Sequence, residues 1–289
     1  MKKFHAILCL MIFVFTSCSK PSGPTVHELP VGTPLVDLEI QENSRSGHTV
    51  YFDNQLVAEY ASVPDIIELR ENIGPFKKGT WLMYFNDTRK ETENELIVAM
   101  AYSIDEGSTW SDRILVPLET EEESFILADV SILELEDGTL RLYFYALEPT
   151  GDIGKTRKIY SAVSNDGLSF TMEALVYETP EQVNNPEVVY HDGLWYLFLT
   201  IPQVSTGYLV SDNPLYFEGY NEMEDIGILG ADSDGENLYV YGCSDSSSEW
   251  LFEKGEFVYL RNTGFEGCDP APHFDSDGVL HMATKVVNF

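Results

Sequence analysis

The stretch Glu187-Val188-Val189-Tyr190-His191-Asp192-Gly193-Leu194-Trp195-Tyr196-Leu197-Phe198 joins an acidic residue, a short apolar run, an Asp-Gly turn and an aromatic-rich run. Similar copies begin at Asp65 and Asp129, and weaker copies begin at Asp225 and Asp269. Alternation with a period of two and many β-branched and aromatic residues are typical of strands, and no window shows a persuasive helical stripe. The pattern predicts an all-β chain built from repeated hairpins.

Repeats of this length predict a β-propeller in which each copy is one four-stranded antiparallel blade. The last copy ends after two or three strands, and residues 35–60 precede the first copy. These residues are expected to supply the missing outer strands and close the ring, which leaves no open edge. We therefore predict a single five-bladed domain over residues 35–289, with six blades as the main alternative. Hairpin turns are expected at Asp137-Gly138, Asp192-Gly193, Asp234-Gly235 and Asp277-Gly278.

A second signature follows the third run of the first copy. Residues Ser103 to Trp110 match the Asp-box, Ser-x-Asp-x-Gly-x-Thr-Trp, and looser copies run from Ser164 to Phe170 and from Ser211 to Phe217. An Asp in this place caps its own turn, Gly supplies the bend, and the aromatic residue packs into the core. We expect these turns to stabilise the fold and to take no part in catalysis.

The N-terminus reads as an export signal. Residues 1–17 hold Lys2 and Lys3 and then an apolar stretch from Ala6 to Phe15, which is too short to be a spanning helix. Phe15-Thr16-Ser17-Cys18 resembles a bacterial lipobox, which implies a mature protein that begins at a lipidated Cys18. Residues 18–34 would be a tether, and the chain would face the periplasm or the cell surface. An ordinary signal cleavage nearby is the alternative.

The composition restricts the partners. A formal charge of -31 repels phosphate backbones, so nucleic acid is not expected as a partner. No cofactor and no catalytic metal are expected, and a structural calcium ion is the one metal left open. An exported location permits a disulfide between Cys243 and Cys268, but two cysteines set no framework, so their pairing stays open.

If each copy is one blade, the acids that open the copies lie at equivalent positions around one central funnel. Asp65, Asp129 and Glu187 then come from three consecutive blades. Neighbouring carboxyl groups in a partly desolvated funnel shift one another's pKa, so that one stays protonated while another is ionised. Glycoside hydrolysis needs that division. The structural alternative is that these acids hold the N–H groups of inner strands.

This arrangement resembles the furanosidase-type propellers, the clan of invertases, levansucrases and arabinanases that includes glycoside hydrolase families 43 and 32. The resemblance rests on the acids at the blade starts, on the strand pair from Asp192 to Phe198 and on the turn from Ser164 to Phe170. It implies Asp65 as base or nucleophile, Asp129 as the residue that tunes the acid, Glu187 as proton donor, and an oligo- or polysaccharide as substrate. The Asn-Asp-Pro-Asn-Gly and Arg-Asp-Pro motifs of invertases are absent.

Five further residues are candidates for binding the substrate. Sugar rings stack on aromatic faces, which suggests Trp81 and Trp195, although second-strand aromatics also fill the core between blades. Asp225, Asp269 and His273 are placed near the funnel by the weaker copies. Two other functions remain open. One is a carbohydrate-binding propeller without turnover, and the other is a sialidase-like enzyme, although none of the seven arginines opens a copy.

Overall fold

The computed structural model describes residues 29, 30, 32, 48–89, 97–120, 126–147, 158–201, 205–223, 227–243, 247–253 and 256–287. Cys18, Asp225, the signal and most of the tether lie outside these residues, so the structure does not test the predictions made for them. Within the described ranges every regular element is a strand.

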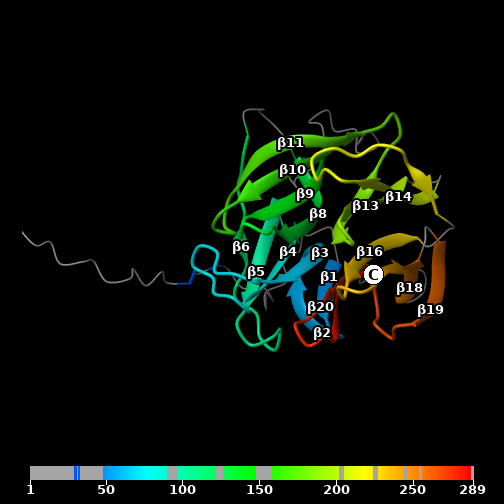
Figure 1. Cartoon of the computed structure of the whole chain (residues 1–289). Coiled ribbons are helices and arrows are strands. Elements are labelled where there is room, and N and C mark those ends of the chain that lie inside the picture. Colours follow the sequence, from blue (N-terminus) through cyan, green and yellow to red (C-terminus); the bar gives the residue numbers. More distant parts are fainter. Residues whose placement is uncertain are drawn as a thin grey trace, which may run out of the picture.

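Five sheets follow one another around a centre and form the five predicted blades (Figure 1). Blade 1 contains β3 (Ala61–Glu68), β4 (Trp81–Asp87), β5 (Ile97–Ser103) and β6 (Ile114–Leu115). Blade 2 contains β8 (Ile126–Glu134), β9 (Leu140–Leu147), β10 (Lys158–Ser164) and β11 (Phe170–Glu178), and β7 (Leu118–Glu119) adds a parallel fifth strand beside β11.

Blade 3 contains β12 (Asn184–His191), β13 (Leu194–Ile201), β14 (Ser205–Ser211) and β15 (Asn221–Glu222). Blade 4 contains β16 (Ile228–Ser233), β17 (Leu238–Cys243), β18 (Ser247–Glu253) and β19 (Glu256–Asn262). Blade 5 contains β20 (Cys268–Phe274), β21 (Leu280–Val287), β1 (His48–Phe52) and β2 (Gln55–Glu59). The inner strands β3, β8, β12, β16 and β20 are neighbours around the ring.

The two ends of the domain meet in blade 5. Strand β1 pairs antiparallel with β21, with Val50 opposite Lys285 and Phe52 opposite Ala283. The prediction that residues before the first copy close the ring is therefore confirmed. Closure buries Val50 and Phe52 against Trp81 and other side chains of blade 1.

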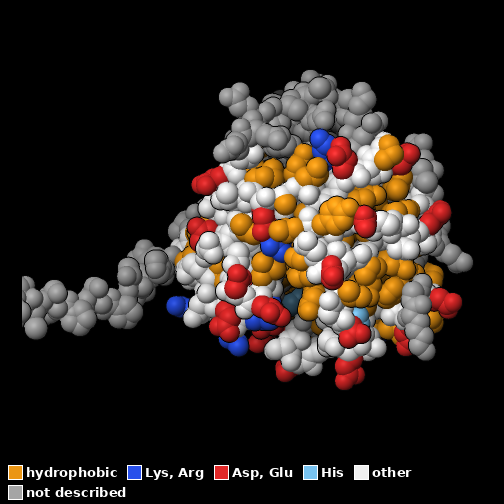
Figure 2. Space-filling model, turned by 45° about the horizontal axis from the view of Figure 1, so that its top comes forward, with side chains coloured by type: hydrophobic (Ala, Val, Ile, Leu, Met, Phe, Trp, Pro, Cys, Tyr) orange, Lys and Arg blue, Asp and Glu red, His pale blue; other side chains and the backbone are white. Residues whose placement is uncertain are grey.

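The predicted Asp-Gly turns join the first and second strands of blades 2, 3, 4 and 5. Their glycines have φ between 77° and 91°, in the left-handed region that L side chains rarely adopt. Hydrophobic cores fill the spaces between neighbouring sheets, as between blades 1 and 2, where Tyr84 and Phe144 are fully buried. The face drawn in Figure 2 carries acidic side chains spread among hydrophobic ones and gathers them in no single patch.

At the turn from Ser103 to Trp110, Asp105 accepts hydrogen bonds from the Thr109 N–H (2.8 Å) and the Thr109 hydroxyl (2.7 Å). Ser103 accepts from the Gly107 N–H at 2.9 Å. Trp110 packs edge-on to Phe52 with ring centroids 5.5 Å apart. This turn therefore connects the outer part of blade 1 to the strands that close the ring.

Candidate functional site

Bulges set the level of each acid on the inner strands. Strands β3, β8, β12 and β20 each carry a register shift near their start, whereas β16 pairs without one. The residue at each bulge has a left-handed φ of about 50°, and these residues are Val63, Asp129, Asn185 and Asp269. Asp129, Asn185 and Asp269 thus occupy the same position on their strands, which we call the bulge level.

The acids do not all occupy equivalent positions, so that expectation needs correction. Asp65 and Glu187 lie two residues beyond the bulge, opposite Tyr84 and Phe198 of their second strands. The residue of blade 2 at that level is Ser131, which lies opposite Tyr143. The bulge lies at the same position in blades 1, 2 and 3, but Asp129 occupies that position itself, whereas Asp65 and Glu187 come two residues after it. The repeat in the sequence does not reveal this offset.

The bulge-level residues form a polar group that we call the strand-start cluster, made of Asn86, Asp129, Tyr145, Asn185, Asp269 and Lys285. The Asn86 amide donates to Asp129 at 3.0 Å, and the backbone N–H of Asn185 donates to the other oxygen of Asp129 at 3.4 Å. The Asn185 side chain donates to Asp269 at 3.2 Å. Blade 3 therefore holds carboxyl groups of blades 2 and 5 next to one another.

The two carboxyl groups of this cluster differ in their environment. Lys285 forms an ion pair with Asp269, and both side chains are largely buried. Burial, followed by the charge of Asp269, raises the pKa of Asp129 to about 6, while hydrogen bonds from Tyr145 and Asn86 and the charge of Lys285 oppose that rise. At mildly acidic pH, Asp129 is thus protonated, whereas the structure places Asp269 in an ion pair with Lys285.

A disulfide anchors the cluster at blade 5. Cys243, at the end of β17, is bonded to Cys268, with Cα atoms 5.3 Å apart. Cys268 immediately precedes Asp269, so the start of β20 is fixed to blade 4. The pairing of Cys243 with Cys268, which the sequence left open, is therefore present in the structure.

Asp65 holds two blades together. Its Oδ1 accepts the N–H of Ile66 at 2.7 Å, and its Oδ2 accepts the N–H of Ile132, on the inner strand of blade 2, at 2.6 Å. Burial is the largest cause that raises the pKa of Asp65 to about 7. With both oxygens bonded to backbone N–H groups, this geometry matches the structural alternative for Asp65.

Asp232 repeats this arrangement between blades 4 and 5, and the sequence analysis missed it. It accepts the N–H groups of Ser233 (2.7 Å) and Phe274 (2.8 Å), and burial raises its pKa to about 7. Asp234-Gly235 is the signal that could have found it, because the inner strand must end just before that turn. Ser131 plays the same part between blades 2 and 3, accepting the Val188 N–H at 3.0 Å.

Glu187 lies deeper in the channel than the strand-start cluster. Burial raises its pKa well above the usual range, and the charges of Asp65 and Asp232 add to that rise. Glu187 therefore releases its proton less readily than an ordinary glutamate. The structure brings Asp65, Glu187 and Asp232 into one electrostatic group and Asp129 and Asp269 into another.

The other predicted binding residues have different surroundings. Trp81 is only 1 % exposed and packs edge-on to Phe52 and His273, so it belongs to the core between blades and not to a binding surface. His273 has its pKa lowered to about 4 by burial and then by His281, so it is neutral at physiological pH. Trp195 is partly buried and lies at the hairpin ends of the inner strands.

The described residues contain neither a metal-binding group nor a membrane-spanning helix. No group of three or more His, Cys, Asp or Glu in those ranges is arranged to hold a metal ion. The same ranges contain no helix that is long and apolar enough to span a bilayer.

Comparison with known proteins identifies structures that share this fold. No protein-family model matches the chain, and no curated protein matches it significantly. Among solved structures, the α-L-arabinanase of Penicillium chrysogenum complexed with arabinobiose superposes with a TM-score of 0.55 at 14% identity, over 79% of this chain and 77% of that one. The fold is that of the propeller glycoside hydrolases.

Two further structures agree. The family GH93 α-L-arabinofuranosidase of Fusarium graminearum with arabinobiose gives a TM-score of 0.55 at 13% identity, over 81% of this chain and 78% of that one. A thermostable family-43 glycoside hydrolase gives 0.50 at 18% identity, over 76% and 80%. At these identities the similarity establishes the fold and leaves the chemistry to the residues.

Proposed function

We propose that this chain is a glycoside hydrolase that cleaves a glycosidic bond of an oligo- or polysaccharide at the strand-start cluster. Two structural neighbours were solved with arabinobiose, which makes arabinose-containing oligosaccharides the first substrates to test. We also propose that the protein is exported and anchored to a bacterial membrane through a lipid on Cys18, as its N-terminus suggests.

The observation that carries the proposal is the contrast between two adjacent carboxyl groups. Asp129, with a pKa of about 6, holds a proton at mildly acidic pH, whereas the ion pair with Lys285 requires an ionised Asp269. Asn185 contacts both carboxyl groups and fixes their relative positions. One protonated and one ionised carboxyl group are what glycoside hydrolysis uses.

We assign the steps accordingly. Asp129 donates its proton to the oxygen of the leaving sugar, and Asp269 acts as base toward water or as nucleophile toward the anomeric carbon. Tyr145 and Asn86 orient the Asp129 carboxyl group. Asp65, which the resemblance suggested as base, instead joins blades 1 and 2. Glu187 is the second candidate for proton donor, because burial and the charges of Asp65 and Asp232 raise its pKa well above the usual range.

The arginines argue against a sialidase. Such an enzyme needs a group of arginines free to bind the substrate carboxylate. Every arginine that the structure describes is paired with an acid of the chain: Arg70 with Glu134, Arg89 and Arg113 with Asp87, Arg141 with Glu173, and Arg261 with Glu249.

The test compares Asp129→Asn, Asp269→Asn and Glu187→Gln on an arabino-oligosaccharide and on a nitrophenyl arabinoside. Loss of a proton donor harms the natural substrate far more than the aryl glycoside, because an activated leaving group needs little protonation. We expect that pattern for Asp129→Asn and loss of both activities for Asp269→Asn. Wild-type kcat/KM should fall as the pH rises above about 6, where Asp129 loses its proton.

Two results would contradict the assignment. The leaving-group pattern in Glu187→Gln, with Asp129→Asn unaffected, would move the acid role to Glu187. Turnover by Asp269→Asn at the wild-type rate would exclude Asp269 as base or nucleophile. A wild-type protein that binds the oligosaccharide but hydrolyses no member of a broad glycan panel would support the non-catalytic alternative.

A further inference from the structure

A cavity lies at the ends of the inner strands opposite to the strand-start cluster. Its volume is about 740 Å³, within the range of small-molecule sites. The ends of all five inner strands line it, through Ile67, Leu133, Val189, Asp232 and His273. Since the strand-start cluster lies at the beginnings of these strands, the two places are separated by the length of the channel. We call this space the hairpin-end cavity.

Hydrogen bonds between neighbouring hairpins hold the rim of this cavity in place. Glu134 of blade 2 accepts the N–H groups of Arg70 (2.6 Å) and Glu71 (3.0 Å) of blade 1. His191 bonds to Ser233 at 2.9 Å, which joins blades 3 and 4.

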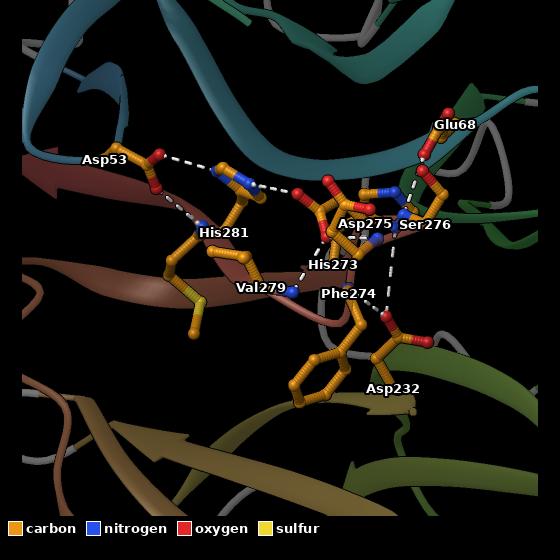
Figure 3. Close-up of polar contacts among 11 residues, drawn as sticks. Asp53, Glu68, Asp232, His273, Phe274, Asp275, Ser276, Val279 and His281 are labelled. Carbon is orange, nitrogen blue, oxygen red and sulfur yellow. Dashed lines mark hydrogen bonds and ion pairs between the residues drawn. The ribbon is translucent and has the colours of Figure 1, made fainter. Parts of the chain in front are cut away.

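Blade 5 is joined to both of its neighbours at the same rim. The N–H of Phe274 donates to Asp232 of blade 4, and the N–H of Ser276 donates to Glu68 of blade 1 at 3.3 Å (Figure 3). Beside them His281 lies between Asp53 and Asp275, at 2.8 and 3.2 Å (Figure 3). A site fixed in this way costs little ordering when a ligand binds.

The cavity wall from blade 3 presents two aromatic rings. Trp195 and Tyr190 lie with centroids 4.8 Å apart, and both line the cavity. Trp195 packs against the blade core, whereas Tyr190 is 47 % exposed. Rigid aromatic faces of this kind bind the C–H faces of sugar rings, and neighbouring polar groups bind the hydroxyls.

The charges of the rim favour a neutral sugar over an acidic one. Glu68, Glu134, Glu136 and Asp137 line the cavity together with Asp232. Of the basic residues there, Arg70 is paired with Glu134, and Arg141 is held by two hydrogen bonds to Glu173. The excess of carboxyl groups repels an anionic ligand.

We infer that the hairpin-end cavity is a binding site for a neutral saccharide, separate from the proposed catalytic cluster. It would hold a second segment of glycan or a free oligosaccharide while the strand-start cluster acts. The inference depends on the cavity alone and stands whether or not the chain hydrolyses its ligand.

Calorimetric titration tests it with the full chain carrying Asp129→Asn, which prevents turnover. The probes are neutral tetrasaccharides of arabinose, xylose, galactose and glucose, with tetragalacturonate as the acidic probe. We expect at least one neutral probe to bind, and binding to weaken at least about tenfold in Trp195→Ala and in Tyr190→Ala. Tyr259→Ala, which removes a similarly exposed tyrosine from the outer strand of blade 4, should change nothing.

In an otherwise wild-type chain, Tyr259→Ala should also leave the hydrolysis of an aryl glycoside unchanged. Tyr190→Ala protects the test against misfolding, because this side chain is exposed. The assignment is overturned if no neutral probe binds, if both aromatic variants bind as tightly as their parent, or if tetragalacturonate binds as well as the neutral probes. Failure of the catalytic proposal alone would appear as absent turnover with this binding intact.

Discussion

The buried carboxyl group of Asp65 makes the stability of the propeller depend on pH in a way that one substitution can isolate. Asp65→Asn keeps the shape of the side chain and removes its titration. Asn has one acceptor oxygen, so the N–H of either Ile66 or Ile132 loses its buried partner. An unsatisfied buried N–H costs about 1–3 kcal/mol. At about pH 4, where Asp65 is protonated in the folded state, the variant should be less stable than wild type by that amount.

The sign of the stability difference between wild type and Asp65→Asn reverses at higher pH. Burial raises the pKa of Asp65 from 3.8 to about 7, so the folded protein holds a proton that the unfolded chain has already released. The stability of wild type therefore falls as the pH rises from about 4 to 7, by about 1.4 kcal/mol per pH unit and about 4 kcal/mol in all. Since Asn does not titrate, the variant should become the more stable protein by about pH 8.

Urea unfolding followed by circular dichroism, at one-unit steps from about pH 4 to pH 8, measures this difference. Tyr84→Phe is the matched control, because it removes one buried hydrogen bond to Gly167 and nothing that titrates in this range. Its cost should stay constant throughout, at about 1–3 kcal/mol. The difference in unfolding free energy between wild type and Asp65→Asn is expected to change sign with pH. A difference that stays constant, or that favours wild type more as the pH rises, would refute the assignment of Asp65 as a buried carboxyl group that holds its proton and joins two blades.

Three further predictions concern the outer parts of the chain. Trp110→Ala should lower the stability by about 3–5 kcal/mol, and an unchanged melting curve with lost glycan binding would contradict the structural role of the Asp-box. Cys268→Ser should cost about 3 kcal/mol by opening a loop of 25 residues, and dithiothreitol should then lower the melting temperature of wild type only. In a bacterium fed labelled palmitate, wild type should carry label, and equal labelling of Cys18→Ala would exclude the lipobox.

The sequence was sufficient for the architecture because a propeller repeats its hydrophobic pattern. The copies at Asp65, Asp129 and Glu187 mark three inner strands, and the Asp-Gly turns mark the hairpins that follow four of the five inner strands. The closure of the ring followed from counting strands in the last copy. Each of these depends on local sequence, which is why they were predictable.

The arrangement within the funnel was less predictable. Asp129 occupies the bulge of its strand, two residues before the level of Asp65, and no pattern of residue types marks this offset. Asp232 was missed because its blade starts with a weak copy. Trp81 and Trp195 both occupy second strands. Trp81 is buried between blades, whereas Trp195 lies beside a cavity. Packing between blades decides such differences.

The pairing of β1 with β21 couples the site to the completion of synthesis. The first strands of the domain leave the ribosome long before their partner, so blade 5 forms only when nearly the whole chain is available. Asp269 and Lys285 belong to that last blade, whereas Asp129 and Asn185 belong to blades made earlier. A chain that ends before β20 therefore lacks Asp269 and Lys285. Such a chain would form an open ring without the proposed catalytic pair.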